Sequence, residues 1–106
     1  MKILLDECID RRFAAELPGH AVETVPAVGW AGKSNGELLS LAHDVFDVFI
    51  TVDQNLVFQK NIVNFDIAVL VLHAPTNRLV DLIPLVKNIL SSLSTVQSGQ
   101  VSDIRV

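Results

Sequence analysis

Acidic side chains follow apolar segments or open a helix-like segment at three places in this chain. Asp6 and Glu7 come directly after the first apolar run, Asp53 follows a later one, and Glu37 opens a helix-like segment between them. Carboxylates gathered in one place repel each other, so they need a compensating positive charge. Hard divalent cations such as Mg²⁺ and Mn²⁺ supply that charge and prefer oxygen ligands. The pattern therefore predicts a metal site that can activate water and stabilise a phosphoryl group under attack.

The same acids also fit purely structural roles. An acid just after a strand is often a helix N-cap or a turn residue, which would account for Asp6 and Asp53 without any chemistry. Ser34 and Glu37 have the spacing of a capping box, in which each side chain satisfies a backbone group of the other. Both interpretations stay open at the level of the sequence.

The elements that must position these acids follow from the apolar periodicity of the chain. Strands are expected at residues 3–5, 21–25, 48–52 and 67–72, with an edge strand within 100–106. Helices are expected at 9–17, 35–46 and 79–93, with Pro84 breaking the last, a short helix or irregular stretch at 55–63, and a polar linker at 91–99. This alternation predicts an α/β fold, a three-layer α/β/α sandwich around a mainly parallel sheet. In such sheets ligands bind beyond the carboxyl ends of the strands, so the acids should meet in one cleft.

Composition narrows the class of protein further. The 106 residues are enough for one domain, half of them are hydrophobic, and only 19% are charged, which excludes a disordered chain. The net charge of −4 excludes a basic protein that coats nucleic acid. One cysteine, Cys8, cannot form an internal disulfide. The apolar runs are too short to cross a membrane, and no secretory signal opens the chain, so we expect a cytoplasmic protein. Its apolar surplus suggests a homodimer or a partner surface.

Several segments in order resemble the PIN-like domain family, in particular its short toxin-type group. The match runs through Leu4-Leu5-Asp6-Glu7, Gly19-His20-Ala21-Val22, Gly29-Trp30-Ala31-Gly32-Lys33-Ser34, Glu37-Leu38-Leu39, Ile50-Thr51-Val52-Asp53 and Asp103-Ile104-Arg105-Val106. Thr51 and Asp53 form the Thr-x-Asp signature of that family. The resemblance implies one PIN-like domain over residues 1–106 with a Rossmann-like fold. It also implies a Mg²⁺- or Mn²⁺-dependent endoribonuclease, the toxin of a toxin–antitoxin pair.

The resemblance also assigns roles to individual residues. Asp6 and Asp53 match the acidic metal ligands of the family, Glu7 matches the second acid of the opening motif, and Thr51 the polar residue before the later aspartate. Two departures remove negative charge, because Asn35 stands where the family usually has an acid and Asn55 where it has the aspartate of an Asp-Phe pair.

Three hypotheses follow for the function. In the first, a ribonuclease, Asp6 and Asp53 hold the metal, and Glu7 or Glu37 completes its shell or positions the attacking water. Thr51 then hydrogen-bonds an aspartate or the phosphate.

In the same hypothesis Arg11 and Lys33 orient the RNA backbone. The second hypothesis is a catalytically degenerate interaction module that acts through a protein partner, which the neutral Asn35 and Asn55 favour. The third is a phosphoacceptor domain with Asp53 as the acceptor, although no lysine follows the apolar run that ends at residue 72.

Overall fold

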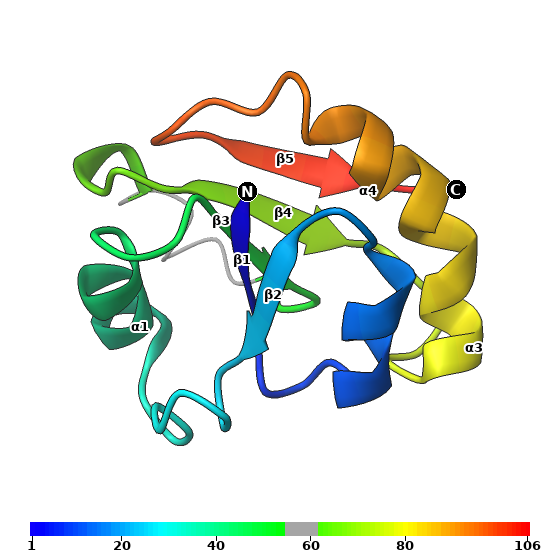
Figure 1. Ribbon diagram of the computed structural model, residues 1–106, viewed down its shortest axis with the longest axis horizontal. Helices are drawn as coiled ribbons and strands as arrows, with labels where there is room; N and C mark the ends of the chain where they lie inside the picture. The colour runs from blue at the N-terminus through cyan, green and yellow to red at the C-terminus, as the bar shows by residue number, and fades with distance from the viewer. Residues whose placement is uncertain (55–61) are drawn as a thin grey trace.

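A sheet of five parallel strands forms the centre of the fold. The computed structural model describes residues 1–54 and 62–106. The strands are β1 (Lys2–Leu5), β2 (Ala21–Thr24), β3 (Val48–Thr51), β4 (Ala68–Leu72) and β5 (Val101–Ile104). Their order is β2-β1-β3-β4-β5, and every neighbouring pair is parallel (Figure 1). The α/β class and the parallel sheet are therefore confirmed, and the arrangement is consistent with a Rossmann-like fold.

Helical segments cover both faces of this sheet. They are η1 (Arg11–Glu16), α1 (Asn35–Ala42), η2 (Ile62–Asn64), α3 (Leu79–Leu82), η3 (Ile83–Leu85) and α4 (Val86–Ser92). Figure 1 shows α1 on one side of the sheet and α3 and α4 on the other. Each face has its own apolar core, so the sheet separates two cores within one fold.

Alternation along the strands divides the side chains between the two cores. Leu4 and Phe49 pack with Leu38 of α1, and all three side chains are buried. Their neighbours Ile3 and Ile50 point to the opposite core, which also contains Phe13, Leu82, Leu85 and Ile89 from the helices of that side. Continuous apolar runs such as that of β3 are expected in a parallel sheet, because both of its faces are covered.

The structure corrects several predicted boundaries. The segment expected as a helix over 9–17 is a 3₁₀ helix, η1, whose Phe13 N–H donates to the carbonyl of Asp10, three residues earlier. Such i→i+3 bonds wind the chain more tightly than an α-helix and usually form only short segments. Ile9 and Leu17 lie just outside the bounds of η1, and their side chains still pack in the core. Helix α1 ends at Ala42 rather than at residue 46.

The C-terminal helical region follows the prediction more closely. Pro84 breaks it as expected, because it stands in η3, between α3 and α4. Helix α4 continues to Ser92, two residues into the expected linker, and β5 confirms the edge strand. The stretch expected at 55–63 lies mostly outside the described residues, apart from the start of η2. In the two described ranges no helix is long and apolar enough to span a bilayer.

Candidate functional site

The strand order reverses between β1 and β3, and both strands carry an aspartate at that point. From β1 the chain continues to β2 on one side, and from β2 it crosses over β1 to reach β3 on the other. Two neighbouring strands whose connections leave in opposite directions create a crevice beyond their carboxyl ends. Asp6 follows β1, and its backbone N–H donates to the carbonyl of Ile50 at 2.9 Å. Asp53 lies two residues beyond β3, so both acids stand at this edge.

Thr51 connects these two aspartates. Its hydroxyl donates to Oδ2 of Asp6 at 2.6 Å. The hydroxyl oxygen of Thr51 also accepts the backbone N–H of Asp53 at 3.0 Å. The Thr51 side chain is wholly buried, and Asp6 is 6% exposed. A buried hydroxyl that both donates and accepts holds its two partners at fixed positions.

Further donors surround the buried carboxylate of Asp6. The backbone N–H of Glu7 donates to Oδ1 at 2.8 Å, and the thiol of Cys8 donates to Oδ2 at 3.4 Å. An ionised carboxylate can stay buried when hydrogen bonds replace its lost hydration. Burial in turn raises the pKa of the Cys8 thiol, and the nearby charge of Asp6 adds to that increase. Cys8 is therefore a protonated donor at neutral pH rather than a reactive thiolate.

Asn35 interacts directly with the second aspartate. Its side-chain amide donates to Oδ2 of Asp53 at 2.7 Å. Asn35 is the first residue of α1, and the N-cap before it, Ser34, fixes the position of that helix start. Asn35 thus lies inside the candidate site, where its amide binds one carboxylate oxygen of Asp53.

The two glutamates predicted for the site have other partners. Both carboxylate oxygens of Glu7 lie 3.3 Å from the backbone nitrogen of Gly32, which donates to them. Gly32 has a φ of 83°, a conformation that favours glycine, so the turn that presents this N–H depends on it. Glu37 completes the predicted capping box, since its backbone N–H donates to the Ser34 hydroxyl at 3.3 Å and its carboxylate accepts the Ser34 backbone N–H at 3.5 Å.

These side chains border an open cleft of about 600 Å³. It is lined by Asp6, Glu7, Cys8, Lys33, Ser34, Asn35, Val52 and Asp53. The cleft brings together the predicted residues Asp6, Glu7, Asp53 and Lys33, with Thr51 behind them. Glu37 does not line it, and Arg11 lines a neighbouring depression that also includes Glu7. Asn55 lies outside the described residues.

Among the described residues, no group of three or more histidine, cysteine, aspartate or glutamate side chains is arranged to hold a metal ion. Asp6 and Asp53, which Thr51 joins, are the two aspartates that line the cleft. The position after β4, where a phosphoacceptor domain would need a lysine, holds His73. Its Nε2 lies 2.7 Å from Oδ1 of Asp103, so this imidazole is already paired.

Sequence reasoning placed Asn35 at the site without its hydrogen bond to Asp53, and it missed Cys8 as a contributor to the cleft. The position of Asn35 was available from the Ser34 capping signal, because the residue after an N-cap lies at the helix start that faces this sheet edge. No pattern in the sequence indicated that Cys8 would donate to Asp6. Comparison of the chain with protein-family models, curated proteins and solved structures gave no match.

Proposed function

We propose that this protein is a metal-dependent ribonuclease of the PIN-like type, which hydrolyses phosphodiester bonds of RNA. The observation that carries the proposal is the pair Asp6 and Asp53, tied to one buried hydroxyl at the edge where the strand order reverses. The ordered motifs that resemble the PIN-like family support the same chemistry. They also support an antitoxin protein as a partner, and a homodimer stays a prediction.

The donor chemistry of the cleft fits a magnesium or manganese ion. Mg²⁺ is commonly bound by one or two carboxylates, with water and substrate phosphate completing its shell. Asp6 and Asp53 provide two carboxylates, and Glu7 lines the same cleft. A divalent ion held there supplies charge neutralisation for a phosphoryl group and lowers the pKa of a bound water.

The remaining side chains orient the reacting groups. Thr51 and the Glu7 N–H hold the Asp6 carboxylate in one orientation, and the Asn35 amide does the same for Asp53. Lys33 lines the cleft, and its positive charge can attract an RNA phosphate. Glu7 is better placed than Glu37 to position the attacking water, because the capping box keeps Glu37 at the helix start.

RNA cleavage by the purified protein tests this proposal. We expect Mn²⁺-dependent cutting of single-stranded RNA that Asp6→Asn reduces by roughly 100-fold or more, since even residues that only orient metal ligands contribute 10–100-fold. Asp44→Asn is the matched control, because the Asp44 side chain is 82% exposed and lies away from the cleft. A folded wild-type protein that cuts no RNA with Mg²⁺ or Mn²⁺ would contradict the proposal.

A specific observation favours a second candidate, an interaction module without catalysis. The Asn35 amide occupies a lone pair of Asp53 and adds no charge, so the cleft has fewer carboxylates than the family pattern implies. Calorimetry separates the two functions. Mn²⁺ binding that Asp53→Ala abolishes supports the enzyme, whereas absence of metal binding together with a stable protein partner supports the module.

A further inference from the structure

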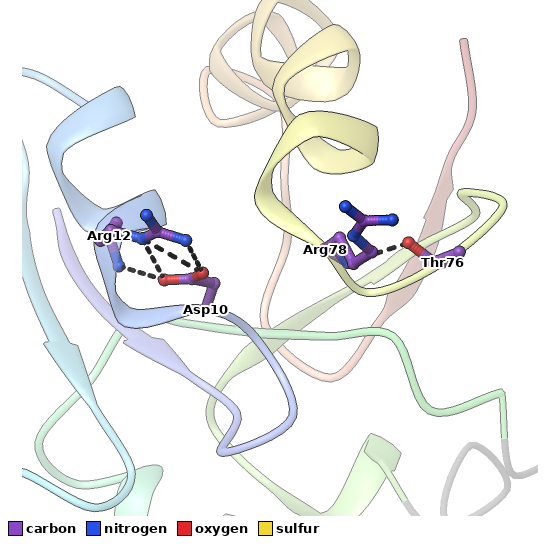
Figure 2. Close-up of polar contacts among 4 residues, drawn as sticks. All are labelled: Asp10, Arg12, Thr76 and Arg78. Atoms are coloured by element: carbon purple, nitrogen blue, oxygen red, sulfur yellow. Dashed lines mark hydrogen bonds and ion pairs between the residues drawn. The ribbon is translucent and has the colours of Figure 1, made fainter.

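A second depression lies at the same edge of the sheet, between η1 and α3. It has a volume of about 390 Å³ and is lined by Asp10, Arg12, Arg78, Leu79, Val80 and Ile83. Figure 2 shows Arg12 on η1 and Arg78 just before α3, on two segments that are far apart in the sequence. Val80 is 64% exposed and Ile83 42%. The depression therefore combines two guanidinium groups with the apolar side chains of Leu79, Val80 and Ile83, which we call its apolar floor.

Asp10 holds the guanidinium of Arg12 in one orientation. Nε of Arg12 donates to both carboxylate oxygens of Asp10, and Nη2 donates to Oδ2 at 2.6 Å. This pairing lowers the pKa of Asp10 to about 2, so the pair stays charged at neutral pH. An arginine has five N–H donors, and those on Nη1 have no acceptor within the described residues. Arg12 is therefore preorganised and still able to bind an anion.

Arg78 supplies the second cation of the depression. Its backbone N–H donates to the hydroxyl of Thr76 at 3.1 Å, which fixes the turn before α3 (Figure 2). Its guanidinium forms no ion pair within residues 1–54 and 62–106. An exposed cation that contributes no intramolecular pair is available to a ligand.

One hydrogen bond connects the segment before the second depression to the rim of the candidate cleft. The side chain of Asn77, next to Arg78, donates to the backbone carbonyl of Cys8 at 2.9 Å, and Cys8 lines the cleft.

Charge is distributed unevenly between the two edges of the sheet. Cations follow the carboxyl ends of three strands: Arg11, Arg12, Lys33 and Arg78. The opposite edge has a depression lined by Asp44, Asp47 and Asp66. At the edge of the candidate site these cations stand beside the acids of the cleft and Asp10, so an anion with several separated charges can contact a cation at more than one place.

We propose that Arg12 and Arg78 bind a phosphate of the RNA strand next to the one that enters the Asp6–Asp53 cleft. This proposal rests on the proposed ribonuclease function and extends its site beyond the reacting phosphate. Phosphates repeat along the backbone, so one strand can occupy the cleft and the depression together. The apolar floor of Leu79, Val80 and Ile83 contacts the sugar or base between them. An acidic peptide is the alternative occupant and forms one arm of the test.

The test is binding of a fluorescein-labelled single-stranded RNA of about ten nucleotides, a length within the range such sites cover, measured by anisotropy in EDTA. We expect Arg12→Gln and Arg78→Gln each to weaken binding by roughly fivefold at low salt, the upper value for an exposed ion pair. Each should also reduce the slope of log K against log salt by about 0.7, because one phosphate contact is lost. Lys2→Gln, which removes one charge at the opposite edge, is the matched control and should change neither quantity.

The outcomes separate this subsite from the catalytic proposal. RNA binding that depends on both arginines supports the subsite. If the same protein cuts no RNA, only the proposed ribonuclease activity is overturned. RNA cleavage with binding unchanged in both variants overturns the subsite and leaves the ribonuclease standing. Arg78→Gln is decisive, because no folded-state pair is lost with it. Absence of RNA binding, or binding of a polyglutamate peptide with the same dependence on both arginines, overturns the assignment to RNA.

Discussion

The hydroxyl of Thr51 donates a 2.6 Å hydrogen bond to the carboxylate of Asp6, a residue 45 positions earlier in the chain. This bond joins β3 to the residue after β1 at the point where the strand order reverses. The same hydroxyl accepts the N–H of Asp53, so one buried oxygen sets the positions of both aspartates. The catalytic proposal depends on that arrangement.

Replacing Thr51 by valine keeps the shape of the side chain and removes the hydroxyl. We expect Thr51→Val to lower the free energy of unfolding by about 2 kcal/mol, because a hydrogen bond to a buried charged group is lost. Mn²⁺ affinity should fall by roughly 10–100-fold, the effect of removing a group that orients a metal ligand. Urea denaturation and calorimetry measure the two quantities.

Thr51→Ser is the control for that change, since serine keeps the hydroxyl and loses only a buried methyl group. It should lower the unfolding free energy by about 1 kcal/mol and leave Mn²⁺ affinity near the wild-type value. Equal Mn²⁺ binding by the valine and serine variants would show that the Thr51 hydroxyl does not organise the site.

The capping box predicts opposite outcomes for Ser34 and Glu37. Ser34→Ala removes the side chain that accepts the Glu37 N–H at the start of α1 and should cost about 1 kcal/mol of unfolding free energy. Glu37→Gln keeps an oxygen acceptor, so stability should change by less than about 0.5 kcal/mol and RNA cleavage by less than about twofold. A large loss of cleavage in Glu37→Gln with normal stability would instead place Glu37 among the reacting groups.

The edge at which the acids meet could be predicted because apolar runs end at Asp6 and near Asp53, and parallel strands place their carboxyl ends together. The partner of Glu7 could not be predicted. Glu7 binds the N–H of Gly32 because that glycine adopts a positive φ, and the sequence shows only that a glycine is present. Arg12 and Arg78 are far apart in the sequence, so their common depression could not be predicted either. It depends on how η1 and α3 pack.

The 3₁₀ conformation of η1 also could not be predicted from periodicity alone. Ile9, Phe13 and Leu17 recur every four residues and favour an α-helix, yet the backbone forms i→i+3 bonds after the Asp10 cap. Periodicity reports which side chains face the core, and it cannot distinguish an α-helix from a shorter 3₁₀ segment with flanking residues that also reach the core.

Acid should weaken the Asp10–Arg12 pair in a defined pH range. Arg12 lowers the pKa of Asp10 from 3.8 to about 2 in the folded protein. A folded-state pKa below the unfolded value means that the stabilisation is complete above about pH 4 and is lost as the pH falls towards 2. Urea denaturation between these values should show a steeper loss for wild type than for Arg12→Gln. Parallel profiles for the two proteins would show that the pair does not stabilise the fold.

Changing Asn35 to aspartate should restore charge to the cleft at a cost to the metal-free protein. Asn35→Asp removes the 2.7 Å hydrogen bond to Asp53 and places two carboxylates side by side, so we expect a loss of about 1–3 kcal/mol without metal. Mn²⁺ binds only the folded state, and stabilisation by a ligand grows with its affinity. The midpoint of thermal unfolding should therefore rise more with Mn²⁺ in Asn35→Asp than in wild type. Asn64→Asp, an exposed position outside the cleft, adds the same charge as a control. If Mn²⁺ stabilises Asn35→Asp no more than Asn64→Asp, Asp53 is not a metal ligand.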